Sequence, residues 1–160
     1  MGVGAPMGLF PGHTSSIRRI EGGMLSYQAD VTLENNPFEI GMDRLVDLDM
    51  DADFVSKKAL TKIKQDGITQ KQVGLVIDGA PLIGSNDEKW PVMVNGESVG
   101  MVTSAIHSPR LEQNIALALV AIGHADLGQA AQIEMGSERR SAMIVEKPFF
   151  DPKKEITAKS

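Results

Sequence analysis

The residues whose types and spacing could recognise a ligand flank a glycine pair near the N-terminus. They are Arg19, Glu21 and Tyr27, around Gly22-Gly23. Glycine lets a backbone come close to a ligand because it carries no side chain. An arginine forks onto a carboxylate, and a tyrosine ring stacks on another flat ring. The pattern therefore suits a ligand with a flat ring at one end and carboxylates at the other. An arginine and a glutamate beside a turn can also form a structural ion pair, and the residues alone leave both interpretations open.

Carboxylates and histidines could offer a second kind of chemistry, the binding of a metal ion. An aspartate stands at every second position from Asp47 to Asp53, and in a strand these side chains would share one face and could hold a hard cation. No glycine turn or terminal glutamate completes a calcium loop there, so we interpret the run as a solvated approach to the following helix, favoured by the helix dipole. The histidines are His13, His107 and His124. They lack metal-ligand spacing, and the sequence predicts no metal site.

The composition excludes several classes of protein. With 160 residues, 42% of them hydrophobic and 23% charged, the chain has the make-up of an ordinary globular protein. Its net charge of −5 argues against sequence-independent nucleic-acid binding, which needs a basic surface. The absence of cysteine excludes a disulfide framework, a thiolate zinc site and a cysteine nucleophile. It also fits a reducing compartment, so we expect a cytoplasmic protein. The longest apolar run, residues 115–122, is too short to cross a membrane.

One helix is predicted clearly, over residues 54–65. Its apolar residues recur on one face while its lysines lie elsewhere. Asp51 or Asp53 could accept a bond from an unpaired amide of the first turn. Gly67 stands where a left-handed residue usually ends a helix.

The rest of the N-terminal part is predicted to be irregular. Glycine and proline indicate a loop over residues 1–16, and Gly22-Gly23 interrupts the mixed stretch 17–27. Residues 45–48 have the composition of a short strand.

Beyond Gly67 the chain has the pattern of a β-protein. Six strand-like segments lie at 71–79, 90–94, 97–104, 114–122, 130–135 and 141–147. Asn95-Gly96 between two apolar runs predicts a hairpin, because both central residues of such a turn need positive φ. Short strands separated by turns predict a small antiparallel β-barrel, and the fold class is α+β, predominantly β. We place the domain boundary so that residues 1–70 precede the barrel and residues 71–160 form it.

Short motifs follow one another in a fixed order along the chain. They are Arg19-Ile-Glu21-Gly-Gly-Met-Leu-Ser-Tyr27-Gln-Ala-Asp30, Pro37-Phe-Glu39-Ile-Gly41, Asp53-Phe54 with Lys58-Ala59-Leu60, Val73-Gly74-Leu75, Gly96 with Val99-Gly100-Met-Val-Thr103-Ser104, Ser108-Pro109-Arg-Leu111 with Asn114-Ile-Ala-Leu-Ala118, and Pro148-Phe149. In this order they resemble the C-terminal part of the glycine cleavage T-protein (aminomethyltransferase) family, over residues 9–152.

The resemblance implies a function. Members of this family bind tetrahydrofolate and pass a one-carbon unit between a substrate and the folate. It implies that residues 1–70 are the end of the folate-binding portion and that Arg19, Glu21 and Tyr27 contact the folate. The catalytic aspartate of the family, and the glutamate that grips the pterin, match no position of this sequence. We therefore expect no catalytic residue here and no activity from this chain alone.

Two departures from the family pattern keep other functions open. Ser15 stands where aminomethyltransferases have a folate-contacting arginine, and residues 151–155 lack their C-terminal tyrosine. The sequence around residues 20–39 is in part similar to that of folate-dependent demethylases of the family, such as dimethylsulfoniopropionate demethylase. A third possibility is a non-catalytic barrel that docks a partner protein, as in flavin-dependent relatives that carry the same barrel.

The resemblance also suggests partners. An aminomethyltransferase would receive its one-carbon unit from the lipoylated carrier protein of the glycine cleavage system. A chain that begins inside a domain would leave an apolar face uncovered, so we also expect self-association through that face. Nucleic acid and membrane are not expected partners.

Overall fold

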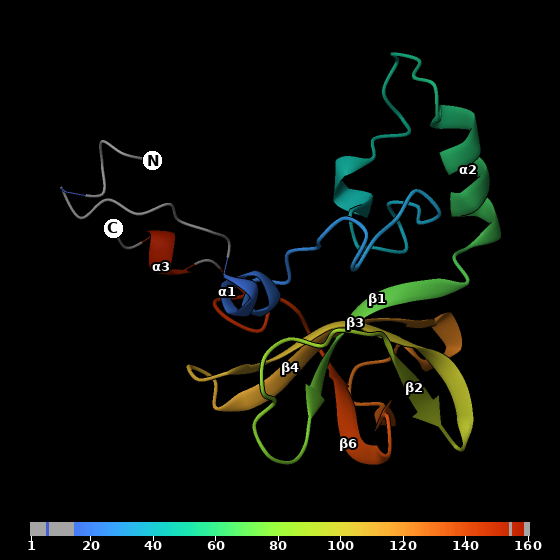
Figure 1. The fold of residues 1–160 in the computed structure, drawn as a ribbon. Helices are drawn as coiled ribbons and strands as arrows, with labels where there is room; N and C mark the ends of the chain where they lie inside the picture. The colour runs from blue at the N-terminus through green and yellow to red at the C-terminus, as the bar shows by residue number, and fades with distance from the viewer. Residues whose placement is uncertain (1–5, 7–14, 154, 159–160) are drawn as a thin grey trace.

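The fold is that of a computed structural model, which describes residue 6, residues 15–153 and residues 155–158. His13 and most of the loop expected over residues 1–16 lie outside the described residues. The elements in chain order are α1 (Ser16–Glu21), η2 (Asp43–Leu45), α2 (Lys57–Asp66), β1 (Gln70–Ile77), β2 (Trp90–Val94), β3 (Glu97–Ser108), β4 (Gln113–Ala121), η3 (Ile122–His124), β5 (Ala130–Met135), β6 (Glu138–Val145) and α3 (Glu155–Ala158) (Figure 1).

Six strands form a closed antiparallel barrel in the order β1-β4-β3-β2-β5-β6. The prediction of a small antiparallel barrel in a predominantly β fold is confirmed. The Asn95-Gly96 hairpin is confirmed too: φ is 53° at Asn95 and 85° at Gly96, and Val94 pairs with Glu97 across the turn. Positive φ at both central residues gives the turn the twist that two antiparallel strands require.

The barrel wall has two apolar faces. Along β1, Val73, Leu75 and Ile77 belong to the core that fills the barrel. Along β4, Ala116 and Ala118 belong to the same core, whereas Ile115 and Leu117 belong to a second buried cluster. Since successive side chains of a strand point to opposite faces, the second cluster lies on the outside of the barrel.

Helix α1 covers this outer face. Ile20 is fully buried in the second cluster with Ile106, Ile115 and Leu117. The segment after β6 reaches the same face, where Phe149 packs against the cluster. Phe149 lies so close to Gly74 that a Cβ there would come within 3.0 Å of its ring. Hydrophobic burial on both sides of the wall therefore holds the chain around residue 20 and the chain around residue 149 against the barrel.

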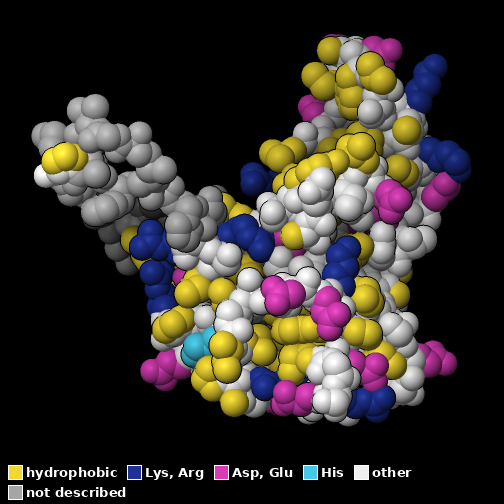
Figure 2. Space-filling model, viewed as in Figure 1, with side chains coloured by type: hydrophobic (Ala, Val, Ile, Leu, Met, Phe, Trp, Pro, Cys, Tyr) yellow, Lys and Arg dark blue, Asp and Glu magenta, His cyan; other side chains and the backbone are white. Residues whose placement is uncertain are grey.

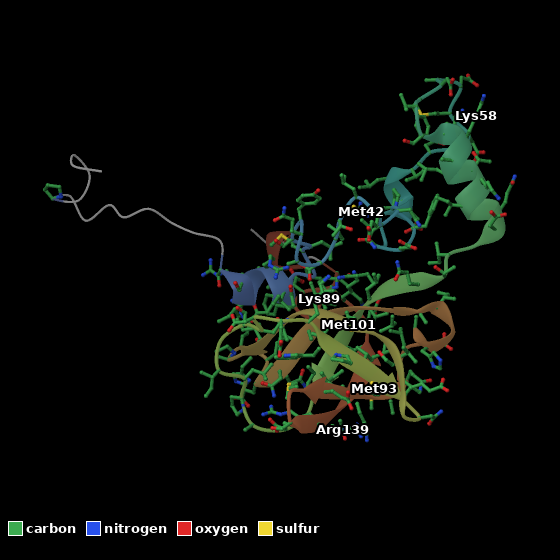
Figure 3. All side chains as sticks on the ribbon, turned by 45° about the vertical axis from the view of Figure 1, so that its right-hand side comes forward. Met42, Lys58, Lys89, Met93, Met101 and Arg139 are labelled. Atoms are coloured by element: carbon green, nitrogen blue, oxygen red, sulfur yellow. The ribbon has the colours of Figure 1, made fainter. Side chains whose placement is uncertain are left out.

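Residues 33–67, which we call the α2 lobe, touch the barrel at one end, where the Gln72 N–H of β1 donates to the Glu39 carbonyl at 2.7 Å, and project away from it at the other (Figure 1). Figure 3 shows Met42 and Lys58 on this lobe, away from Met93, Met101 and Arg139 on the barrel. No residue of α2 is buried.

The predicted helix of the α2 lobe is confirmed, but it begins at Lys57 instead of residue 54. Asp53 accepts a bond from the Phe54 N–H at 3.0 Å, and it stands three residues before the N-cap, Ser56, so it does not cap the first helical turn. Ser56 takes the capping position without a side-chain bond, and Gly67 ends the helix with a φ of 83° as expected. The strand expected over residues 45–48 is wrong, because a 3-10 turn and bends occupy that region.

The aspartate run from Asp47 to Asp53 lies in bends, so its side chains do not share the face of a strand. Its members are exposed, and Asp47 accepts bonds from the backbone N–H groups of Asp49 and Met50 at 3.0 and 3.1 Å. Among the residues that the structure describes, no group of histidine and carboxylate side chains is arranged to hold a metal ion. No helix in the described part of the chain is both long and apolar enough to span a bilayer.

Candidate functional site

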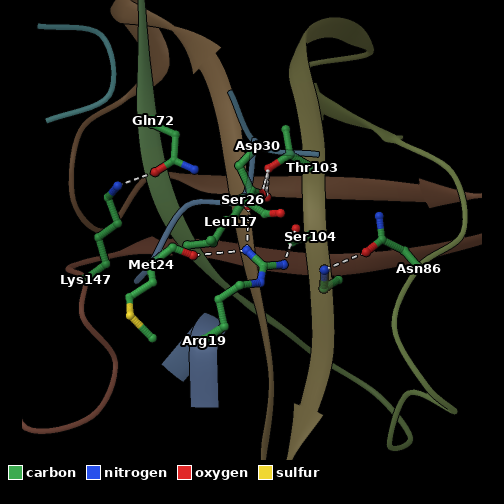
Figure 4. Close-up of polar contacts among 11 residues, drawn as sticks. Arg19, Met24, Ser26, Asp30, Gln72, Asn86, Thr103, Ser104, Leu117 and Lys147 are labelled. Atoms are coloured by element: carbon green, nitrogen blue, oxygen red, sulfur yellow. Dashed lines mark hydrogen bonds and ion pairs between the residues drawn. The ribbon is translucent and has the colours of Figure 1, made fainter. Parts of the chain in front are cut away.

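Arg19 and Asp30 form the centre of a polar cluster between α1 and the barrel (Figure 4). The Arg19 Nη1 atom donates to the Asp30 Oδ2 atom at 2.5 Å and to the Met24 carbonyl at 3.0 Å, and its Nη2 atom donates to the Ser104 Oγ atom at 2.8 Å. The Arg19 side chain keeps 16% of its surface exposed, whereas the Asp30 side chain is fully buried. The guanidinium thus joins α1, the following loop and β3.

The described residues that bond to the Asp30 carboxylate are all hydrogen-bond donors, which stabilise its ionised form. Besides Arg19, the backbone N–H of Ser26 donates to Oδ2 at 2.8 Å, and the Thr103 hydroxyl donates to Oδ1 at 2.6 Å. Hydrogen bonds to an ionised acceptor are roughly twice as strong as neutral ones. A charge this deeply buried needs such partners, because losing water costs several kcal/mol per ion.

A β-bulge brings two neighbouring barrel residues into this cluster. In the pairing of β3 with β4, the register shifts between Val102 and Ser104, which leaves Thr103 as the extra residue. In a regular strand Thr103 and Ser104 would point to opposite faces. The bulge re-aims one of them, so that Thr103 reaches Asp30 and Ser104 reaches Arg19.

Glu21 belongs to a separate set of contacts at the end of the same helix. Its buried carboxylate accepts a bond from the Ser108 hydroxyl at 2.5 Å and lies 3.7 Å from the Arg110 guanidinium. Its backbone carbonyl accepts bonds from the N–H groups of Phe149 and Phe150 at 2.9 and 3.1 Å. Glu21 therefore ties α1 to the end of β3 and to the segment after β6. The structural ion pair of Arg19 with Glu21 does not form, because residues two apart on a helix do not face each other.

Tyr27 is the exposed member of the three expected ligand-binding residues. Its side chain is 60% exposed, and that of Met24 in the same loop is 55% exposed. The backbone of this loop is fixed by two hydrogen bonds: Arg19 donates to the Met24 carbonyl, and the Ser26 N–H donates to Asp30. An exposed aromatic ring on a loop fixed in this way can stack on a flat ligand.

Lys147 lies against the same outer face of the barrel, and the sequence patterns give no sign of it. Its ammonium group donates to the Gln72 side-chain oxygen (Figure 4). Burial lowers the pKa of Lys147 to about 8; the charge of Asp30 opposes this shift and that of Lys71 adds to it. The Gln72 side-chain nitrogen has no partner among the described residues.

The lowered pKa of Lys147 makes stability depend on pH in a way that a Lys147→Met variant should reveal. Between a folded pKa of about 8 and the ordinary 10.5, the unfolded chain binds more protons than the folded one. The free energy of unfolding of the parent should therefore rise relative to that of Lys147→Met as pH increases through this window. Urea titrations at about pH 7 and pH 10 measure the difference. Lys153→Met, at an exposed position, is the control, and the same slope for both variants would contradict the prediction.

A closed six-stranded antiparallel barrel, with an N-terminal helix bonded to its outer face, defines the structural class of this protein. The model of the glycine cleavage T-protein C-terminal barrel domain matches residues 70–151. The chain therefore belongs to the glycine cleavage T-protein family, through its C-terminal barrel domain.

Proteins similar in sequence to this chain are aminomethyltransferases. The chain is 41% identical to an aminomethyltransferase of Parasynechococcus marenigrum (strain WH8102), over 82% of this chain and 35% of the relative. It is 38% identical to the aminomethyltransferase of Synechococcus sp. (strain RCC307), over 91% of this chain and 39% of the relative. The chain thus spans well under half the length of these relatives.

A solved structure has the same fold. It is the crystal structure of glycine cleavage system aminomethyltransferase T from Bartonella henselae, which matches 85% of this chain and 38% of its own with a TM-score of 0.77. At 21% identity this likeness supports the fold alone.

Proposed function

We propose that this chain is the C-terminal portion of a tetrahydrofolate-dependent, aminomethyltransferase-like one-carbon transferase, and that it supplies the barrel and one edge of the folate site without being active alone. The observation that carries the proposal is the match to aminomethyltransferases over most of the chain. The match to the relative of strain RCC307 covers 91% of the chain and so includes Arg19, Glu21 and Tyr27. The names of these relatives favour aminomethyl transfer over demethylation. The donor partner would then be a lipoylated carrier protein.

The described residues fit one part of a folate molecule. The exposed Tyr27 ring offers an apolar surface for a flat ring, and Met24 of the same loop is exposed as well. Arg19 donates three of its five side-chain N–H groups to Met24, Asp30 and Ser104. Two N–H groups are left to donate to a ligand carboxylate. Bound tetrahydrofolate would accept the one-carbon unit.

In this proposal the three residues have different tasks. Tyr27 contacts the ring of the folate directly. Arg19 contacts the ligand with its remaining N–H groups and also holds the loop that carries Tyr27. Glu21 acts from a buried position, where its bonds to Ser108 and Arg110 fix the end of α1.

Tyr27→Ala should weaken the binding of tetrahydrofolate about 5- to 10-fold, because an aromatic pair contributes roughly 1 kcal/mol beyond its buried area. Calorimetric titration with tetrahydrofolate and with 5-methyltetrahydrofolate measures the effect. Tyr27→Phe keeps the ring and should bind like the parent, and so should Leu33→Ala, at a position 90% exposed in the α2 lobe. Equal affinity of the parent and Tyr27→Ala would reject Tyr27 as a folate contact. No detectable binding by the parent would reject a folate site on this chain.

A further inference from the structure

The side chains of Lys147 and Gln72 make an incomplete set of hydrogen bonds on the outer face of the barrel. Gln72 is 2% exposed, and its Oε1 atom accepts from the Lys147 ammonium group. Because an ammonium group only donates, this contact fixes which end of the amide faces Lys147. The Nε2 atom of the same amide is buried and has no acceptor among the residues that the structure describes. A buried donor without a partner costs free energy and indicates a missing acceptor.

Lys147 is half-buried and differs in charge from the lysines of the surface. Figure 2 shows lysine and arginine side chains scattered over the face in view, where water solvates them. Burial instead lowers the pKa of Lys147 to about 8. At pH 8 roughly half of the Lys147 side chains are then uncharged, against less than about 1% for a lysine with the ordinary pKa of 10.5. An uncharged amine carries the lone pair that a nucleophile needs.

The missing acceptor can come from Lys147 itself once its amine is modified. The modified group must keep an N–H for the Gln72 Oε1 atom and place an oxygen on the same side of its new N–C bond, facing Nε2. An acetylated lysine does not meet this condition, because a secondary amide is trans, with its N–H and its oxygen on opposite sides. A carbamate does meet it, because its carbon carries two oxygens and one of them always lies beside the N–H.

We propose that Lys147 is a site of reversible carbamylation by carbon dioxide, and that the carbamate pairs edge to edge with the Gln72 amide. The lone pair of the uncharged Lys147 Nζ atom attacks the carbon of CO₂ and forms an N–C bond. One C=O electron pair moves onto oxygen, and the nitrogen releases a proton to water. The remaining N–H donates to Gln72 Oε1, and the oxygen beside it accepts from Gln72 Nε2. The modification does not depend on the proposed folate function.

Charged neighbours act on the carbamate in both directions. The charges of Asp30 and Lys71 both act on the Lys147 side chain. Asp30 repels a negative carbamate, but its ion pair with Arg19 at 2.5 Å neutralises much of its charge. Lys71 is exposed and attracts the carbamate. Removing the charge of Lys71 should therefore reduce carbamylation, although water screens the effect at an exposed position.

Trapping with triethyloxonium tests the proposal, because ethylation makes a carbamate permanent. The parent is equilibrated at about pH 8 with ¹³C-labelled bicarbonate and CO₂, alkylated and digested, and mass spectrometry locates the label. We expect the label on Lys147 and not on the exposed Lys89 and Lys153. The α-amino group of the chain, with an ordinary pKa of about 8, is the positive control for the chemistry. Purging with nitrogen before alkylation should remove the label, since the carbamate is reversible.

Gln72→Met separates the paired amide from the uncharged amine. The variant keeps the approximate size of the side chain but removes both the acceptor of the ammonium and the donor to the carbamate. Losing the acceptor favours the uncharged amine, so reactivity alone would leave the label unchanged or raise it. Losing the pair should instead lower the label on Lys147 about tenfold. Lys71→Gln should lower it about two- to threefold, and Lys153→Gln, at another exposed position, should leave it unchanged.

Either of two results would overturn the proposal. One is no label on Lys147 when the α-amino group is labelled. The other is a Gln72→Met variant whose Lys147 is labelled as fully as that of the parent. Circular dichroism and urea unfolding show whether each variant is folded, and Gln72→Leu repeats the test of the pair should Gln72→Met not fold.

Discussion

Asp30→Ala should lower the free energy of unfolding by about 3–5 kcal/mol, because it leaves a partly buried guanidinium without its counter-charge. Arg19 would lose its 2.5 Å ion pair, and the Ser26 amide would lose its acceptor. The Thr103 hydroxyl would keep one partner, the Leu117 carbonyl at 3.1 Å. Since Arg19 retains 16% exposure and can gain some water, the loss should fall toward the lower end of this range. Urea unfolding gives the value from the shift of the midpoint at constant slope.

Two further variants test whether the charge or the shape of Asp30 matters. Asp30→Asn keeps the size but places an N–H₂ group among donors, so we expect an intermediate loss. Glu34→Ala removes an exposed carboxylate from the nearby loop and should change the free energy of unfolding by less than about 0.5 kcal/mol. A loss below about 1 kcal/mol for Asp30→Ala would show that the Arg19–Asp30 pair does not hold the N-terminal segment to the barrel.

Gly100→Ala should be the most damaging single-methyl change in the barrel, at about 3 kcal/mol or more. A Cβ at this position would lie 2.3 Å from the Leu119 carbonyl oxygen and 2.7 Å from the Val120 Cα atom. Both neighbours are backbone atoms of β4, so a rotamer change cannot relieve the clash. The only escape is to separate β3 from β4, which pair at Gly100 and Val120.

Unfolding followed by tryptophan fluorescence can measure the effect of Gly100→Ala, because the only tryptophan, Trp90, pairs with Val102 on β3. Gly123→Ala is the matched control, since a Cβ at Gly123 would meet no atom within 4 Å. That control should unfold within about 0.5 kcal/mol of the parent. Equal stability of the two alanine variants would mean that β3 and β4 do not approach as closely as the structure shows.

Features that depend only on residues adjacent in the sequence were predictable. The Asn95-Gly96 turn and the end of α2 at Gly67 rest on backbone conformations that few residues adopt. The strands of the barrel follow from apolar alternation, which shows as inward-facing Val73, Leu75 and Ile77. Residues 45–48 were predicted wrongly because a short apolar run does not distinguish a strand from a turn.

The polar cluster could not be predicted in the same way. Asp30 meets Thr103 across 73 positions of the chain, Arg19 meets Ser104 across 85, and Gln72 meets Lys147 across 75. Which polar groups become partners depends on how α1 packs and on the register shift in β3. Neither leaves a local pattern in the sequence.

The sequence by itself determined the barrel, its family and the group of residues around Gly22-Gly23, because periodicity, turn chemistry and ordered motifs are local properties. Only the tertiary structure decided which contacts these residues make and which of them stay exposed. Burial of Ile20 on the outer barrel face brings Arg19 to Asp30 and Glu21 to Ser108, while Tyr27 stays exposed. A buried charge must find partners wherever the fold supplies them, whereas an exposed ring remains available to a ligand.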